Sequence, residues 1–261
     1  MPELYFQDHP GPQEHAPLVL LHGLFGSGAN WRGIARRLSA GRRVLVMDMR
    51  NHGRSFNDST MTYPQMARDV LDTLDGQGID HADLLGHSMG GKVAMAAALD
   101  NPGRVNRLIV VDIAPVIYTH THMPLIEAMM SLDASSLGSR AEADEKLGSS
   151  IRDQMTRGFL LQSLEKNADE GYRWRLNLEA LQRGMDDLVG FPEFPDKTFD
   201  GPVLFVYGSD SEYVQHEHRP GISRYFPNAG YAAVEDAGHW VHADQPGLLI
   251  EQVEKFLKDN D

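Results

Sequence analysis

The sequence predicts an α/β fold in which a mostly parallel central sheet is flanked by helices. Short apolar runs without alternation recur along the chain, and such runs are typical of strands buried on both faces of a parallel sheet. Helical patterns separate these runs, and strand–helix alternation indicates a wound α/β sheet. The chain has 261 residues, 41% of them hydrophobic, so it can bury a large core as a single α/β unit.

Each strand is expected where an apolar run stops at a polar or glycine-rich loop. The predicted strands are residues 4–7, 17–21, 43–47, 81–85, 108–111, 202–207 and 231–234. The predicted helices are residues 30–39, 62–74, 90–101 and 245–257, the last with an apolar stripe at helical spacing.

Residues 115–201 break this alternation, because they contain helical patterns but no convincing buried strand. A segment this long cannot be a plain loop inside a compact domain. We therefore expect residues 1–114 and 202–261 to form the core, with residues 115–201 as a helical cap over the carboxyl edge of the sheet. A few ordinary crossover helices are the alternative.

The charge balance excludes several classes of partner. Lys and Arg total 24 against 37 Asp and Glu, a net charge of −13, which disfavours nucleic acids and anionic membrane surfaces. The absence of cysteine excludes disulfides, thiolate metal sites and cysteine nucleophiles. No apolar run reaches the roughly 18 residues of a membrane span, and the first residues lack the features of a signal peptide. We expect a cytoplasmic monomer or homodimer without stable membrane insertion.

The strongest local signal is the Gly-His-Ser-Met-Gly motif that ends at Gly90. It follows a predicted strand and precedes a predicted helix. Gly86 and Gly90 remove side chains that would clash in a sharp turn. That turn lifts the Ser88 hydroxyl clear of the sheet and places the Met89 amide beside it. The motif predicts Ser88 as a nucleophile; the alternative is a glycine-rich turn whose serine only caps the helix.

A serine hydroxyl needs a base to take its proton. Of the 12 histidines, His239 follows the last predicted strand and precedes the last helix, so its loop lies at the same edge of the sheet as Ser88. His242 is expected to pack or cap nearby. His216 and His218 have no third clustered ligand, so we interpret them as surface residues rather than a metal site.

The base needs a carboxylate that orients its imidazole. Asp112 follows the strand after the nucleophile helix, and Asp210 follows the next strand. Either could serve, and either could instead stabilise a turn.

A developing oxyanion needs two backbone donors. The Met89 amide is one, and the loop 22–28 supplies the other through Leu24 or, alternatively, Phe25. This loop lacks the Gly-Lys-Ser/Thr ending of a phosphate-binding loop and does not match Gly-x-Gly-x-x-Gly, which disfavours nucleotides. Ser, His and two amides suffice for acyl transfer, so no metal and no organic cofactor is expected.

Four motifs carry a family resemblance: HGLFGSGANW from His22, DMRNHGRS from Asp48, GHSMGG from Gly86 and GHW from Gly238. With them the chain resembles the α/β-hydrolase family. The segments VDIAP, WRLNLEAL and AGHWVHAD make it most similar to the YbfF-type esterases and related mitochondrial abhydrolase-domain proteins. The resemblance implies an α/β-hydrolase fold, a helical cap, and hydrolysis of carboxylic esters or thioesters. It also favours Asp112 of VDIAP as the acid, because those relatives carry Asn where this chain has Asp210.

The predicted function is that of a serine carboxylesterase acting on short- to medium-chain acyl esters. Phe25 and Trp240 are expected in the substrate pocket, and the methionines of the cap as its adaptable wall, unless they only pack the cap. One alternative is an acyl-CoA thioesterase, for which Arg50 and Arg54 would form a basic entrance. Another is a non-catalytic small-molecule receptor or scaffold on the same fold.

Overall fold

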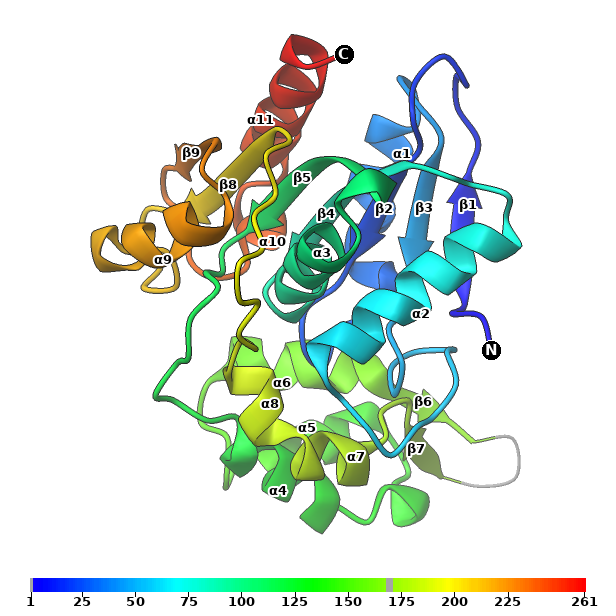
Figure 1. Cartoon of the computed structure of the whole chain (residues 1–261). Coiled ribbons are helices and arrows are strands. Elements are labelled where there is room, and N and C mark those ends of the chain that lie inside the picture. The colour runs from blue at the N-terminus through cyan, green and yellow to red at the C-terminus, as the bar shows by residue number, and fades with distance from the viewer. Residues whose placement is uncertain (1, 168–170) are drawn as a thin grey trace.

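The computed structural model describes residues 2–167 and 171–261. Within them, seven strands form one sheet in the order β1-β3-β2-β4-β5-β8-β9 (Figure 1). Only β1 runs antiparallel to its neighbour, and the other pairs are parallel. The strands are β1 Phe6–His9, β2 Leu18–Leu21, β3 Val44–Met47, β4 Ala82–His87, β5 Val105–Val111, β8 Val203–Gly208 and β9 Ala229–Val234. The prediction of a mostly parallel sheet flanked by helices is confirmed.

Helices cover both faces of the sheet, which explains why its strands read as unbroken apolar runs. In β2, Val19 and Leu21 pack into one core cluster, whereas Leu18 and Leu20 pack into the other. The first face carries α2 Tyr63–Gly76, α3 Met89–Asp100 and α9 Arg219–Tyr225, and the second η1 Gly28–Trp31, α1 Arg32–Leu38, α10 Val241–Asp244 and α11 Pro246–Asp259.

The remaining helices form a layer beyond the carboxyl ends of the parallel strands (Figure 1). They are α4 Met123–Ser131, α5 Arg140–Leu147, α6 Gln154–Leu160, α7 Leu178–Arg183 and α8 Met185–Val189, with the short turns η3 Ala134–Ser136 and η4 Leu161–Ser163. Two further turns, η2 Pro102–Arg104 and η5 His216–His218, lie in the rest of the chain. The division into a core and a cap at residues 115 and 201 stays a prediction.

An antiparallel ribbon in this layer was not predicted. It pairs β6 Leu164–Lys166 with β7 Tyr172–Trp174. Each strand has three residues, and only Leu164 among them is buried. Such short, half-exposed strands leave no periodic apolar signal in the sequence.

The buried ammonium of Lys92, on α3, joins the two chain segments that connect this layer to the sheet. Its Nζ donates hydrogen bonds to the carbonyl oxygens of Val116 at 3.1 Å, Val189 at 3.0 Å and Gly190 at 2.5 Å. The rings of Tyr63 and Tyr118 also face it, with centroids 5.6 and 4.9 Å from Nζ. Burial lowers the pKa of Lys92 to about 7. The entry and exit of the helical layer therefore meet at one buried side chain.

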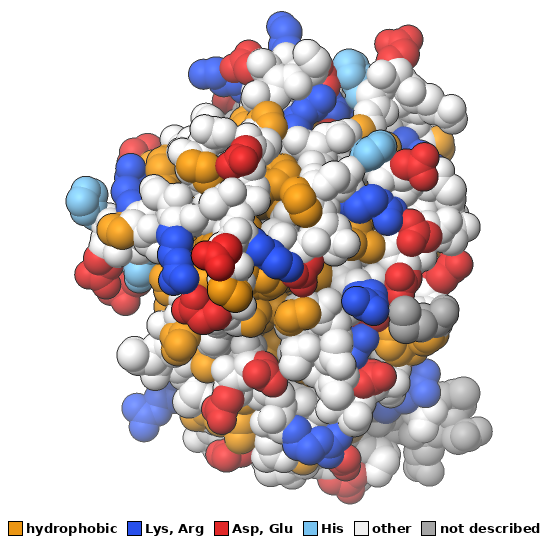
Figure 2. Space-filling view, in the orientation of Figure 1, with side chains coloured by type: hydrophobic (Ala, Val, Ile, Leu, Met, Phe, Trp, Pro, Cys, Tyr) orange, Lys and Arg blue, Asp and Glu red, His pale blue; other side chains and the backbone are white. Residues whose placement is uncertain are grey.

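The surface shows no segregation of charge on the face seen in Figure 2, where acidic and basic side chains alternate among apolar ones. Within residues 2–167 and 171–261, no helix combines the length and the apolar composition needed to cross a lipid bilayer.

Candidate active site

Ser88 lies in the sharp turn between β4 and α3. Its backbone has φ 51° and ψ −118°, a strained conformation for a residue with a side chain. The two glycines of the motif make this turn sterically possible. A Cβ at Gly86 would lie 2.1 Å from the Gly90 carbonyl oxygen, and one at Gly90 would lie 2.5 Å from the Leu21 carbonyl oxygen. The alternative of a helix-capping serine is not supported, because the Ser88 side chain makes no capping hydrogen bond.

His239 connects Ser88 to Asp112. Its Nε2 lies 3.1 Å from Ser88 Oγ, and its Nδ1 lies 2.8 Å from Asp112 Oδ2. Asp112 follows β5 and is fully buried. The three side chains thus come from three different strand ends, at 88, 112 and 239, and form a continuous hydrogen-bonded chain. In this geometry a base contacts the hydroxyl while a carboxylate holds the base.

The alternative acid, Asp210, lies elsewhere. It is exposed, accepts a hydrogen bond from Ser209 Oγ at 3.2 Å, and donates its backbone amide to the Ala237 carbonyl at 3.0 Å. Among the described residues it makes no hydrogen bond with His239. The same loop instead supplies Ser211, whose hydroxyl donates to Asp112 Oδ2 at 2.5 Å.

Burial sets the protonation of this chain of residues. It lowers the pKa of His239, so the imidazole is neutral and able to accept a proton. Burial raises the pKa of Asp112 to about 7, and the hydrogen bonds from the Ser211 hydroxyl and the Gly208 amide oppose this rise. The carboxylate therefore depends on those two donors for its charge near neutral pH.

The loop after β2 is shaped by two buried, neutral histidines. His22 Nε2 accepts the Met49 amide at 2.9 Å, and burial lowers the pKa of His22 to about 4. His52 Nε2 accepts the Phe25 amide at 3.3 Å, and burial lowers the pKa of His52 to about 3. Because the Phe25 amide is engaged there, it is a poor candidate for an oxyanion donor. No acceptor among the described residues is bonded to the Leu24 amide.

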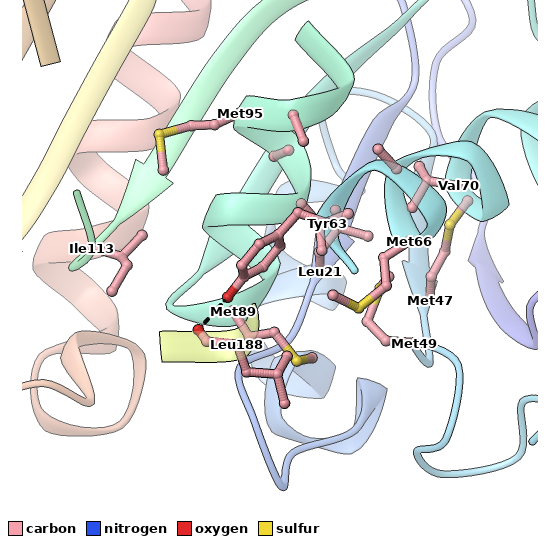
Figure 3. Packing of buried hydrophobic residues seen from close by; sticks show 14 of the residues in the cluster. Leu21, Met47, Met49, Tyr63, Met66, Val70, Met89, Met95, Ile113 and Leu188 are labelled. Atoms are coloured by element: carbon pink, nitrogen blue, oxygen red, sulfur yellow. Dashed lines mark hydrogen bonds between the residues drawn. The ribbon is translucent and has the colours of Figure 1, made fainter. Parts of the chain in front are cut away.

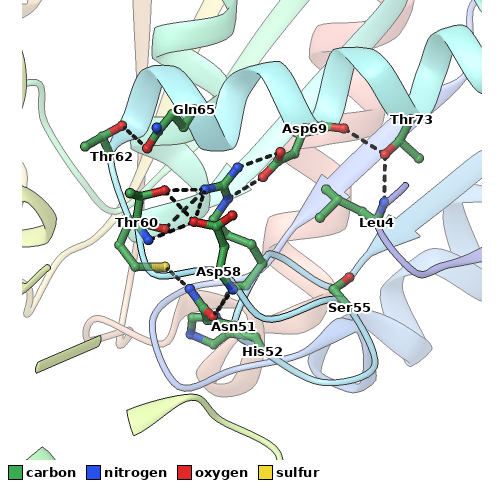
Figure 4. Close-up of polar contacts among 12 residues, drawn as sticks. Leu4, Asn51, His52, Ser55, Asp58, Thr60, Thr62, Gln65, Asp69 and Thr73 are labelled. Carbon is green, nitrogen blue, oxygen red and sulfur yellow. Dashed lines mark hydrogen bonds and ion pairs between the residues drawn. The ribbon is translucent and has the colours of Figure 1, made fainter. Parts of the chain in front are cut away.

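The loop after β3 packs against this one through the rings of His22 and His52, and its Arg50 does not face solvent. Arg50 is buried and makes a two-pronged contact with Asp69 through Nε–Oδ2 at 2.6 Å and Nη2–Oδ1 at 2.8 Å. It also donates to Thr60 Oγ1 at 2.8 Å (Figure 4). The expectation that Arg50 could meet coenzyme A phosphates is therefore wrong. Arg54 is exposed and lies over the Tyr5 ring, at 5.0 Å from its centroid.

A cavity of about 270 Å³ opens beside Ser88 and His239. Phe25 and Trp240 both line it, together with Leu125, Phe159 and Leu160 from the helical layer. The Trp240 and Phe159 rings lie 5.4 Å apart between centroids. This cavity is apolar around a polar centre, as small-molecule sites usually are.

The expectation that methionines form an adaptable wall of this cavity is wrong. Among the described residues that line this cavity there is none of Met123, Met129, Met130 and Met155. Met129 is fully buried in the core and Met123 packs against it, whereas Met130 and Met155 are exposed. The wall is built from less flexible leucine and aromatic side chains.

Two residues at the site were missed in the sequence. The Tyr213 ring stacks on His239, with centroids 3.9 Å apart and an interplanar angle of 21°. Ser211, two residues earlier, holds Asp112. Both belong to the segment after β8 that drew attention only for Asp210, so position in that loop was the one available signal.

The other histidines lie as follows. His242 packs between the rings of Trp31 and His87, at 5.0 and 4.6 Å between centroids. His216 is exposed, and His218 faces Tyr118 edge-on at 5.8 Å. In the part of the chain that the structure describes, no group of three His, Asp or Glu side chains is arranged to hold a metal ion.

Comparison with known proteins bears on this site. A family model described as "alpha/beta hydrolase fold" matches residues 16–246. The sn-1-specific diacylglycerol lipase ABHD11 of Danio rerio is 42% identical over 256 residues, which cover 95% of this chain and 80% of that protein. The esterase YbfF of Escherichia coli (strain K12) is 37% identical over 246 residues, covering 94% of each chain. A solved structure titled "Marine microorganism esterase" superposes with a TM-score of 0.94 at 36% identity, over 98% of this chain and 100% of that one.

Proposed function

Because this chain belongs to the α/β-hydrolase fold family, we propose that its Ser88 site hydrolyses carboxylic esters through a covalent acyl-enzyme. The protein is a carboxylic ester hydrolase, as supported by esterase and lipase relatives at 37% and 42% identity. The observation that carries the mechanism is the hydrogen-bonded chain from Ser88 through His239 to Asp112.

In the first half of the reaction, Ser88 Oγ attacks the ester carbonyl while His239 Nε2 takes its proton. The oxyanion is held by the amides of Leu24 and Met89. The bond between the carbonyl carbon and the alcohol oxygen then breaks, and His239 returns the proton to the departing alcohol. Asp112 stabilises the imidazolium that exists between these two transfers.

In the second half, a water molecule attacks the acyl-enzyme. His239 takes a proton from this water, a second oxyanion forms in the same place, and the carboxylic acid leaves with Ser88 restored. The substrates are esters of short- to medium-chain acids, and the cavity between the sheet edge and the helical layer gives the bound ester an apolar wall. A cytoplasmic location and a monomeric or homodimeric state stay predictions of the sequence.

Covalent labelling tests this proposal directly. A fluorophosphonate probe should modify Ser88, and Ser88→Ala should lose both labelling and hydrolysis of p-nitrophenyl acetate while keeping its circular dichroism. Ser59→Ala, which changes an exposed serine, is the matched control and should behave as the parent. Probe modification of another residue with Ser88 intact would contradict the assignment. A folded protein that binds esters without turnover would instead support the receptor alternative.

A further inference from the structure

The cavity at Ser88 has two lobes of very different size. The larger lobe is the cavity of about 270 Å³ described above, and the smaller lobe has a volume of about 30 Å³. Both are bordered by Leu24, Ser88, His122 and Tyr213, so they meet at the nucleophile. An ester bound at Ser88 has two arms, one acyl and one alcohol, and each lobe can receive one of them.

The position of His239 decides which arm enters which lobe. The departing alcohol must receive its proton from His239 Nε2, so it has to lie beside this ring. His239 lines the larger lobe and, among the described residues, is not part of the lining of the smaller one. Met89 lines the smaller lobe and, among the described residues, is not part of the lining of the larger one, whereas Leu24 lines both. With the alcohol arm beside His239 in the larger lobe, the acyl arm on the same carbonyl carbon points past Met89 into the smaller lobe.

Buried side chains form the inner wall of the smaller lobe. Figure 3 shows the side chains of Tyr63, Met89 and Leu188 close together, and Ile113 follows the end of β5. Leu188 is held in place because the Tyr63 hydroxyl donates to its carbonyl oxygen at 2.6 Å. On the same measure, this lobe of about 30 Å³ is much smaller than the larger lobe of about 270 Å³.

The one charged residue at this lobe does not offer an ionic contact to the acyl group. Lys92 lines the lobe, but an ammonium has three N–H donors. All three are directed at the carbonyls of Val116, Val189 and Gly190. A carboxylate at the end of an acyl chain would therefore gain no free donor from it, which leaves small uncharged acyl groups.

Resting on the proposed function, we propose that the acyl arm of the ester occupies the smaller lobe and the alcohol arm the larger one, so that the enzyme favours short acyl groups on larger apolar alcohols. The acyl chain lies beside Tyr63, Met89 and Leu188. The alcohol lies among Leu125, Phe159, Leu160 and Trp240 of the larger lobe. Selectivity for the acid arises at α8 and the end of β5, and selectivity for the alcohol arises at α6 and the His239 loop.

Two substrate series with the unmodified enzyme test this assignment. For p-nitrophenyl acetate, propionate, butyrate and hexanoate, kcat/KM should fall about 10- to 200-fold across the series as the acyl chain outgrows the smaller lobe. For methyl, butyl and hexyl acetate, kcat/KM should rise about fourfold per methylene buried. A kcat/KM that rises with acyl length through hexanoate would overturn the assignment. Absence of hydrolysis with every ester would instead contradict the proposed function itself.

A pair of leucine variants locates the two selectivities. Leu188→Ala enlarges the smaller lobe and should raise the hexanoate-to-acetate ratio of kcat/KM at least tenfold. Leu160→Ala enlarges the larger lobe and should leave that ratio unchanged while flattening the alkyl acetate series. The reverse pattern would mean that the acyl group occupies the larger lobe. If Leu188→Ala does not fold, the substrate series alone decides.

Discussion

Replacing Asp112 by Asn should be far more damaging than replacing Asp210 by Asn. Asp112 accepts three hydrogen bonds: from His239 Nδ1 and the Ser211 hydroxyl on Oδ2, and from the Gly208 amide on Oδ1. An amide has only one acceptor end. If its oxygen meets His239, its NH₂ group faces the Gly208 amide; if it is flipped, its NH₂ group faces His239. Either way one buried donor is left without an acceptor.

The size of the loss follows from these contacts. An unsatisfied buried donor costs about 1–3 kcal/mol. Loss of the negative charge beside the imidazolium removes a further ~4 kcal/mol, the interaction at about 4 Å with an effective dielectric constant of about 20. The sum of about 5–7 kcal/mol is comparable to the ~10⁴-fold loss in kcat found for such a change in a Ser-His-Asp triad, which equals about 5.4 kcal/mol.

The assay is kcat and KM for p-nitrophenyl acetate, with fluorophosphonate labelling as a count of competent sites. Asp112→Asn should lose kcat by about 10⁴ with KM little changed. Asp210→Asn, the matched control in an exposed position, should stay within about tenfold of the parent. A large loss of kcat in Asp210→Asn, together with a nearly unchanged kcat in Asp112→Asn, would refute the reasoning. Two partial losses that become severe only in the double variant would show that both carboxylates serve His239.

Three further predictions concern the supports of the site. The pKa of Asp112 is raised to about 7, so its carboxylate is lost as the pH falls through 7, and kcat/KM should fall with it. Ser211→Ala removes a hydrogen bond of about 1.5–3 kcal/mol that lowers the pKa of Asp112. The acidic limb of the pH–rate profile should therefore move up by about 1–2 pH units. A limb that does not move would contradict the role of Ser211. Lys92→Met removes a hydrogen bond from three carbonyls, of which that of Val189 keeps the Tyr118 amide, and should lower the free energy of unfolding in urea by at least ~2 kcal/mol. Lys146→Met, at an exposed i,i+4 ion pair, should change it by less than about 0.5 kcal/mol. Gly86→Ala places a Cβ 2.1 Å from the Gly90 carbonyl oxygen and should destabilise the fold by more than ~2 kcal/mol. Gly33→Ala is the control: this position lies in helix α1, and an added Cβ would have no heavy atom within 4 Å, so the change should be neutral or stabilising.

The sheet could be predicted because each strand produces an apolar run of adjacent residues in the sequence. Runs such as Leu18–Leu21 are buried at every position, and only a strand covered on both faces produces that pattern. Ser88 was predictable for the same reason, since its two glycines, its strand and its helix are adjacent in sequence. The β6–β7 ribbon was not, because two strands of three residues carry too little apolar periodicity.

Contacts between distant loops were the harder part of the site. Nothing local distinguishes Asp112 from Asp210, since each follows a strand at the same edge; the choice depended on family resemblance, and the structure brings Asp112 to His239 at 2.8 Å. The stacking of Tyr213 on His239 joins two loops that are distant in sequence, and neither loop contains a sequence pattern that predicts the contact. The volume of a lobe likewise depends on side chains from several elements, such as Met89, Ile113 and Leu188.

The convergence of two chain segments on Lys92 has a consequence for how the sequence can vary. The carbonyls of Val116 and Val189 lie within 3.1 and 3.0 Å of one nitrogen, and the Tyr118 amide donates to the same Val189 carbonyl at 3.1 Å. The 70 or so residues between them leave the sheet and return to it at a single point. A segment whose ends already touch can be lengthened, shortened or exchanged at little cost in loop closure. Insertions between residues 118 and 189 can therefore remodel the walls around a substrate while the distances among Ser88, His239 and Asp112 stay fixed.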